Sequence, residues 1–264
     1  MRLAVSGHEA YVYTGTRPIV PGRPAVLFVH GAGNDHSVWA LQSRYFAHHG
    51  FNVLTPDLPG HGRSGGKPLA EVQAIADWLA ALLEAARVER ATIVGHSLGA
   101  LAVLEMASRH HARVVRIALL GPGVPMPVSE ALLAAARADD PGACDMIVGW
   151  SHAPARQIGG NPAPGMWMTG NALRLLQRSR PGVLYVDLMA CHTYVQGLDA
   201  AASVRCPSLV VLGSRDLMAP PKSAAALIER LADPRVVTLA DGGHAMMAEQ
   251  PDAVLDALRG FVAD

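Results

Sequence analysis

Lysine and cysteine side chains are scarce in this sequence, and each scarcity excludes a class of protein. Its only lysines are Lys67 and Lys222, and 22 basic side chains are balanced by 22 acidic ones, so the chain lacks the positive field that binds nucleic acids or anionic membranes. Three cysteines are too few and too scattered for a disulfide framework or a zinc site. No apolar run approaches the ~18–20 residues of a membrane span, and the first residues turn polar too early for a signal peptide.

The remaining composition is that of a globular protein with a large core. Half of the 264 residues are apolar, and a chain of this length buries roughly 70–75% of its unfolded surface. We therefore expect a cytoplasmic protein, a monomer or small homo-oligomer. We expect it to act on a small molecule, without a nucleic-acid or membrane partner.

Six short apolar runs recur along the chain, and each ends in a turn or polar loop. Because the runs are apolar on both faces, they indicate a sheet covered by helices on both sides. Their alternation with helical patterns implies right-handed crossovers. The expected fold class is α/β, with a mostly parallel twisted sheet and helices on both faces. The expected strands are residues 25–30, 52–57, 91–95, 114–120, 208–213 and 235–239, the expected helices are 69–84, 98–108 and 251–262, and residues 4–5 and 11–14 allow a leading hairpin.

The strand–helix rhythm breaks between about residues 124 and 200. This segment holds five of the ten methionines and two of the four tryptophans, and its glycine- and proline-rich stretch 159–165 is one that no regular helix crosses. A single methionine is more often core packing than a binding residue, so the interpretation depends on the clustering. We interpret residues 124–200 as a helical cap inserted over a core domain that comprises residues 1–123 and 201–264.

Residues 95–99, Gly-His-Ser-Leu-Gly, have the G-x-S-x-G pattern of a nucleophile elbow. The turn in such an elbow strains the backbone at the serine, so small residues must flank it two positions away. The hydroxyl then projects above the sheet, near the positive end of the following helix. Glycine and serine are common in loops, and the pattern alone is weak. Its place between an expected strand and an expected helix predicts Ser97 as a nucleophile.

A serine hydroxyl needs a base and a group that orients the base. In elbow-type folds these partners follow the serine in the order acid, then histidine. Asp216 comes just after the expected strand 208–213, and His244 lies in the loop after the last expected strand. Asp241 is an alternative acid, but it is too close in sequence to reach behind His244 easily.

Acyl transfer also needs N–H donors directed at the developing oxyanion. The backbone amide of Leu98, directly after the serine, is one candidate. The second is the amide of Ala32 in the loop His-Gly-Ala-Gly at residues 30–33, whose glycines let the loop lie close to the serine.

Five motifs in this order resemble those of the α/β-hydrolase superfamily, and the resemblance covers essentially the whole chain. The resemblance implies Ser97 as nucleophile, His244 as base and acid and Asp216 as orienting carboxylate, with no metal or organic cofactor. The pattern is similar to small bacterial esterases, enol-lactonases, carbon–carbon bond hydrolases and cofactor-free haloperoxidases with a helical cap. The motifs are residues 30–33 with Trp39 downstream, 57–64, 95–99, 213–216 and 242–244.

Two further patterns have simpler interpretations. Residues 60–65 fit G-x-G-x-x-G, but Pro68 separates them from the next helix, and a dinucleotide fingerprint would open directly into one. We interpret them as a loop at the top of the sheet. Cys191 and His192 suggest a thiol nucleophile, but with a serine triad elsewhere we expect Cys191 to pack in the interior.

We expect a serine esterase that cleaves small to medium, largely apolar substrates through an acyl-enzyme intermediate. A carbon–carbon bond hydrolase is an alternative, which an anion-pairing arginine in the cap (Arg156, Arg174, Arg178 or Arg180) would favour. Enol-lactonase or perhydrolase-like activity, and a ligand receptor on a hydrolase fold, are the others. The expected pocket residues are Gly31, Trp39, His96, Trp150, Trp167, Met168, His192, Met218 and Met246.

Overall fold

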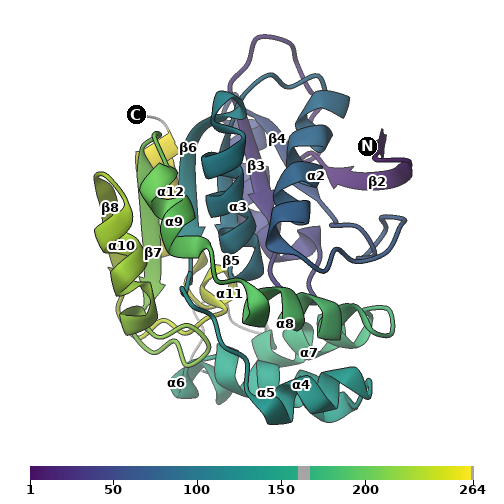
Figure 1. The fold of residues 1–264 in the computed structure, drawn as a ribbon, viewed down its shortest axis with the longest axis vertical. Helices are drawn as coiled ribbons and strands as arrows, with labels where there is room; N and C mark the ends of the chain where they lie inside the picture. The colour runs from purple at the N-terminus through teal and green to yellow at the C-terminus, as the bar shows by residue number, and fades with distance from the viewer. Residues whose placement is uncertain (160–166, 263–264) are drawn as a thin grey trace.

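The computed structural model describes residues 1–159 and 167–262 (Figure 1). Most of the predicted glycine- and proline-rich stretch therefore lies outside the described residues, as does Met166. Within the described ranges, no helix combines the length and apolarity needed to cross a bilayer.

An eight-stranded sheet with the order β1-β2-β4-β3-β5-β6-β7-β8 forms the centre of the molecule. Strands β3 to β8 pair in parallel, and β1 and β2 join antiparallel at one edge. The carboxyl ends of the parallel strands therefore meet at one edge, where the predicted functional loops lie. The strands are β1 (Arg2–Val5), β2 (His8–Tyr13), β3 (Ala25–Val29), β4 (Asn52–Pro56), β5 (Ala91–His96), β6 (Val114–Leu120), β7 (Ser208–Gly213) and β8 (Pro234–Leu239).

Alternate side chains of the inner strands enter two cores, one on each face of the sheet. On β3, Leu27 and Val29 join the core under α2, α3, α9 and α10, whereas Val26 and Phe28 join the core under η1, α1, α11 and α12. Every residue of β3 is buried, which explains why its sequence shows no polar alternation. The helices are η1 (His36–Trp39), α1 (Ala40–His48), α2 (Val72–Ala85), α3 (Leu98–Arg109), η2 (His111–Arg113), α9 (Gly197–Ser203), η3 (Pro221–Ala224), α10 (Ala225–Arg230), α11 (Met246–Glu249) and α12 (Pro251–Val262).

Five further helices follow β6 in the chain: α4 (Glu130–Arg137), α5 (Pro141–Ser151), α6 (Pro154–Gln157), α7 (Met168–Gln177) and α8 (Val183–Thr193). Figure 1 shows α4, α5, α7 and α8 gathered beyond one end of the sheet. We call α4 to α8 the cap helices. They have a small hydrophobic core of their own, made of Leu132, Ala136, Ala143, Leu184 and Leu188.

Helix α8 belongs to the cap and to the main core at once. Leu184 and Leu188 pack in the cap, whereas Ala190 and Cys191 join the core under α3. Just after α8, the Tyr194 hydroxyl donates a buried hydrogen bond of 2.6 Å to a carboxylate oxygen of Glu105 on α3. The cap is therefore joined to the core along α8 by buried contacts as well as by the chain.

The expected fold class is confirmed, and each of the six expected strands lies within one residue of its predicted bounds. The leading hairpin is present as β1 and β2. The domain division at residues 123/124 and 200/201 stays a prediction, and α9 spans the second boundary.

Candidate active site

Ser97 is the single residue between β5 and α3, and its backbone is strained. Its φ of +55° and ψ of −120° lie outside the regions that residues with a Cβ commonly adopt. Its amide donates to the carbonyl oxygen of Leu120 at the end of β6, at 3.0 Å. Leu98 begins α3, so its amide has no acceptor within the helix. Ser97 and the Leu98 amide are therefore held together at the carboxyl edge of the sheet.

The two glycines that flank Ser97 are required by the packing. A Cβ at Gly95 would lie 2.2 Å from the carbonyl oxygen of Gly99, and one at Gly99 would lie 2.4 Å from the carbonyl oxygen of Val29 on β3. Both clashes are with backbone atoms, which side-chain movement cannot relieve. The close approach of β5, α3 and β3 leaves room for glycine only.

His244 and Asp216 form a buried hydrogen-bonded pair. The His244 Nδ1–H donates to Oδ2 of Asp216 at 2.7 Å, and the amides of Met218 and Ala219 donate to Oδ1 at 2.8 Å each. Because the carboxylate only accepts, Nδ1 carries the proton, and Nε2 of His244 is left for another partner. Asp241, the alternative acid, is exposed and pairs with Arg215.

Two crossing loops bring this pair together. A Cβ at Gly213, the last residue of β7, would lie 2.4 Å from the carbonyl oxygen of Gly243 and 2.6 Å from that of Gly242. The loops after β7 and β8 therefore touch through their backbones. His96 holds the second loop, since its Nε2 donates to the carbonyl oxygen of His244 at 2.9 Å. Burial keeps the pKa of His96 well below its usual range, so this ring is neutral.

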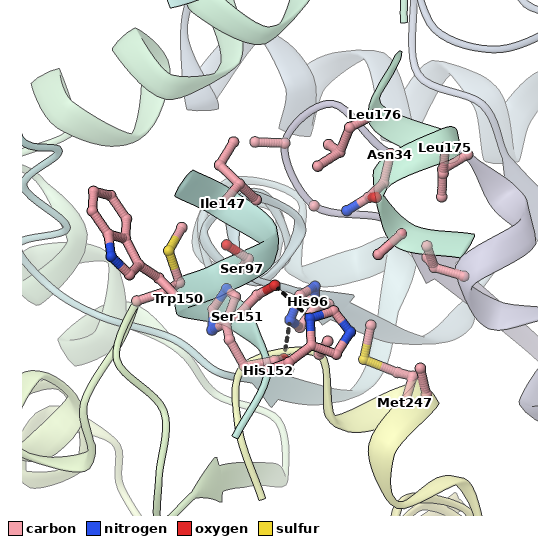
Figure 2. Close-up of a pocket in the computed structure, with 18 of the residues that line it drawn as sticks. Asn34, His96, Ser97, Ile147, Trp150, Ser151, His152, Leu175, Leu176 and Met247 are labelled. Carbon is pink, nitrogen blue, oxygen red and sulfur yellow. Dashed lines mark hydrogen bonds between the residues drawn. The ribbon is translucent and has the colours of Figure 1, made fainter. Parts of the chain in front are cut away.

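A cavity of about 950 Å³ lies between the carboxyl edge of the sheet and the cap helices. Ala32, Ser97 and His244 line it from the core side, so the structure brings the predicted nucleophile and base to one space. Figure 2 shows Ser97 in the middle of the lining residues, among Ile147 and Trp150 of α5. The cap side is largely apolar. It includes Met126, Val128, Leu132, Ile147, Trp150, Met168, Leu175, Leu176 and Leu188.

Five of the nine predicted pocket residues line this cavity: Gly31, His96, Trp150, Met168 and Met218. The other four have different surroundings. Trp39 is fully buried against Phe28 in the core, Met246 is fully buried in the same core, and Trp167 is 67% exposed. His192 is exposed and accepts a hydrogen bond from the Val128 amide. In the segment just after His244, Ala245 and Met247 line the cavity in place of the expected Met246.

Two neighbouring histidines, one in the loop after β3 and one in the loop after β4, differ in their hydrogen bonds and protonation. His30 donates from Nδ1 to the Gly31 carbonyl and accepts the Leu58 amide at Nε2, so it is neutral, and burial lowers its pKa to about 4. His61 faces the Pro59 carbonyl with Nδ1 and the Asp187 carboxylate with Nε2, so both nitrogens donate. Burial alone lowers the pKa of His61, but Asp187 outweighs it and raises the pKa above its usual value. The two rings lie 5.0 Å apart.

Among the residues described, Asp35, His36 and Asp57 place three possible metal-ligand atoms within 4.8 Å of one another. The His36 amide and ring donate to Asp57 Oδ1, and the Arg63 amide donates to Oδ2. Asp35 caps η1 through the Ser37 amide. These hydrogen bonds give the group a structural explanation.

Two arginines of the cap, Arg174 and Arg178, line the cavity. Arg178 pairs with Asp35, and Arg174 donates to Gln177. Cys191 also lines the cavity, but burial raises the pKa of its thiol, which opposes formation of the nucleophilic thiolate.

Several residues of this region had no signal in the sequence. Gly121, at the end of β6, has a φ of +57°, and a Cβ there would lie 3.1 Å from Nδ1 of His244. His152 lines the cavity from the end of α5. Glu249 is fully buried and accepts the amides of Ala153 and Gly243, at 3.2 Å each, which ties the cap to the His244 loop. Burial raises the pKa of the Glu249 carboxyl.

Known proteins resemble this chain in sequence and in fold. The sequence profile described as "Alpha/beta hydrolase family" matches residues 26–257. A pimeloyl-[acyl-carrier protein] methyl ester esterase from Aromatoleum aromaticum is 33% identical over 258 residues, which cover 90% of this chain and 99% of that protein.

Solved structures share the fold at low sequence identity. The enol-lactonase from Burkholderia xenovorans LB400 superimposes with a TM-score of 0.89 over the whole of both chains, at 22% identity. An esterase from Exiguobacterium antarcticum has a TM-score of 0.86 over 100% of this chain and 99% of its own, at 17% identity.

Gly121→Ala is expected to slow modification of Ser97 by a fluorophosphonate by at least about 10-fold, because the new methyl group displaces the His244 ring. Mass spectrometry of the labelled peptide over time measures the rate. Gly50→Ala is the matched control, since Gly50 also has a positive φ (+91°) but has open space around it. A rate in Gly121→Ala equal to that in Gly50→Ala would show that the methyl group does not disturb His244.

The His30 and His61 rings are expected to differ in protonation at pH 7. Long-range ¹H–¹⁵N NMR should show His30 as the neutral Nδ1–H form and His61 as the cation. The raised pKa of His61 contributes to the free energy of unfolding, and this contribution is complete below about pH 6.5 and lost as pH rises through the folded-state pKa. The lowered pKa of His30 acts in the other direction, and the protein loses stability as pH falls from about 6.5 toward about 4. A neutral His61 at pH 7 would contradict its pairing with an ionised Asp187.

Proposed function

Because the chain belongs to the α/β hydrolase family, we propose that it is a serine hydrolase that cleaves small to medium, largely apolar carboxylic esters. Its similarity to an esterase over 90% of its length makes it an esterase-like member of that family. The observation that carries the proposal is the buried Asp216–His244 pair beside a strained serine at the same cavity.

The reaction proceeds in two steps through an acyl-enzyme. Ser97 Oγ attacks the ester carbonyl carbon while His244 Nε2 takes its proton, and His244 then gives that proton to the departing alkoxide oxygen. Water attacks the acyl-enzyme, with His244 again taking and returning one proton, and the carboxylic acid leaves. Asp216 keeps Nδ1 of His244 protonated and stabilises the imidazolium that forms in each step.

The amides of Ala32 and Leu98 are the donors for the oxyanion. Leu98 is suited because its N–H is the first of α3 and lies directly after the nucleophile. Ala32 lines the cavity, and its neighbour Gly31 packs so close to Ser97 that a Cβ there would lie 3.2 Å from the Ser97 Cβ. Removing one such donor typically costs about 10²–10³ in kcat.

The cavity supports an apolar substrate. Its cap wall is made of aliphatic, methionine and tryptophan side chains, and Leu41, Trp150 and Leu217 line it while partly exposed to solvent. This apolar rim is suited to the entry of an uncharged acyl or alcohol group. Its volume of about 950 Å³ is within the range typical of ligand sites for drug-sized molecules.

A methyl ester of an acyl group attached to an acyl carrier protein is a second candidate. It is supported by the activity of the relative from Aromatoleum aromaticum, which matches this chain over nearly its own full length. A carbon–carbon bond hydrolase is a further alternative, supported by the two arginines, Arg174 and Arg178, on the cavity wall.

Ser97→Ala is expected to lower hydrolysis of p-nitrophenyl esters by about four to six orders of magnitude, because no other group forms the acyl-enzyme. Initial rates with the acetate to decanoate series measure this loss and find the acyl length that fits the cavity. Ser203→Ala, at an exposed serine of α9, is the control and should match the unmodified protein.

Activity that survives in Ser97→Ala would contradict the nucleophile. A folded protein that cleaves no aryl ester, but hydrolyses the methyl ester of an acyl group attached to an acyl carrier protein, would favour the second candidate. Cleavage of a vinylogous diketone alone would favour the carbon–carbon bond hydrolase.

A further inference from the structure

One carboxylate of the cap reaches the oxyanion loop. Asp187, on α8, is 1% exposed, and its Oδ2 accepts the backbone amide of Gly33 at 2.8 Å. The same oxygen accepts Nε2–H of His61, also at 2.8 Å. This carboxylate therefore joins the cap, the loop after β3 and the loop after β4 at one buried point.

The bond to Gly33 fixes the peptide that follows Ala32. Gly33 has a φ of +66°, and a Cβ there would lie 3.0 Å from side-chain atoms of both Leu176 and Leu184, so the cap also packs directly against the loop. Ala32 contacts the cap core and the main core. When the Gly33 N–H is held by Asp187, the orientation of the preceding residue, and with it the direction of the Ala32 N–H, is restricted.

The charge of His61 makes this arrangement compatible with an oxyanion. A carboxylate alone near the oxyanion loop would repel the negative charge that develops on the substrate oxygen. Because both ring nitrogens of His61 donate to acceptors, the ring is a cation and the pair with Asp187 is neutral overall. Both side chains are 2% exposed, so water screens the pair little.

We propose that Asp187 is a positioning residue through which the cap holds the oxyanion loop in its active conformation, with His61 as its counter-charge. The inference rests on the proposed function, since it assigns to Ala32 the role of oxyanion donor. It makes the cap helix α8 a part of the catalytic arrangement in addition to a wall of the cavity.

The contact itself is tested by hydrogen exchange of residues 31–34. Asp187→Ala removes the acceptor of the Gly33 amide, and exchange of this peptide should become faster. Asp187→Asn keeps an acceptor oxygen of the same size but loses the charge, and protection should be largely retained. Val183→Ala, one turn earlier on α8, is the matched control, because Val183 is buried and has no part in the loop contact.

The catalytic consequence is tested with two inhibitors and with ester kinetics. Asp187→Ala is expected to lower kcat about 10- to 100-fold with little change in KM, since a misplaced donor acts in the transition state. A trifluoromethyl ketone adds to Ser97: a bond forms between Oγ and the ketone carbon, the proton goes to His244, and the oxygen becomes an oxyanion. Its affinity should fall in parallel with kcat, whereas that of the unreactive methyl ketone should not change.

Three results would overturn the proposal. Exchange of residues 31–34 that is unchanged in Asp187→Ala would show that the carboxylate does not hold the loop. Equal weakening of the two ketones would show that Asp187 shapes the cavity and not the oxyanion site. The same pattern in Val183→Ala would reduce the effect to general loss of stability. A folded protein with no ester hydrolysis and no ketone adduct at Ser97 would instead overturn the proposed function, and the exchange experiment would still decide whether Asp187 holds the loop.

Discussion

The site depends on a turn in which β5 gives way to α3 within the one residue Ser97. A turn this tight brings the backbone of the helix against the strand it has just left and against β3 beside it, as the 2.2 and 2.4 Å clashes of a Cβ at Gly95 and Gly99 demonstrate. The pairing of β3 with β5 belongs to the same arrangement, because it places the loop after β3, with Ala32, next to the serine. The strain at Ser97 is supported by the surrounding packing and by the amide bond to Leu120.

Two buried carboxylates near the site, Asp216 and Asp187, are stabilised in the same way. Asp216 is compensated by two backbone amides and the His244 ring, and Asp187 by the Gly33 amide and the His61 ring. In each case a carboxylate restrains a histidine or a loop that it reaches from another element. Such groups are held by hydrogen bonds to both oxygens or by an opposite charge, which limits the cost of removing them from water.

The sequence allowed prediction of those features that depend on local pattern. Apolar runs without polar alternation predicted the inner strands, and the glycines on either side of Ser97 predicted the elbow because the whole G-x-S-x-G pattern lies within five residues. The long-range contacts of Asp187 with Gly33, 154 residues away, and of Glu249 with Ala153, 96 residues away, have no such local cause. Trp39 and Met246 were expected in the pocket, but both are buried in the core. Successive residues of a helix face different directions. On α11, Met246 therefore faces the core, whereas its neighbour Met247 lines the cavity.

Helix α8 packs in both the cap and the main core, and this limits which segments of the chain can be replaced by those of a relative. Residues 183–194 carry the Asp187 contact, the leucines of the cap core and the Tyr194–Glu105 hydrogen bond to α3. A recombination event that imports α4 to α7 and ends before Val183 keeps the Asp187 and Tyr194 contacts with the core, and the imported helices need only fit the leucines of α8 and the Glu249 contact. One that also replaces α8 separates buried partners that must match in shape and charge. New substrate ranges are therefore most accessible to this scaffold through residues 124–182.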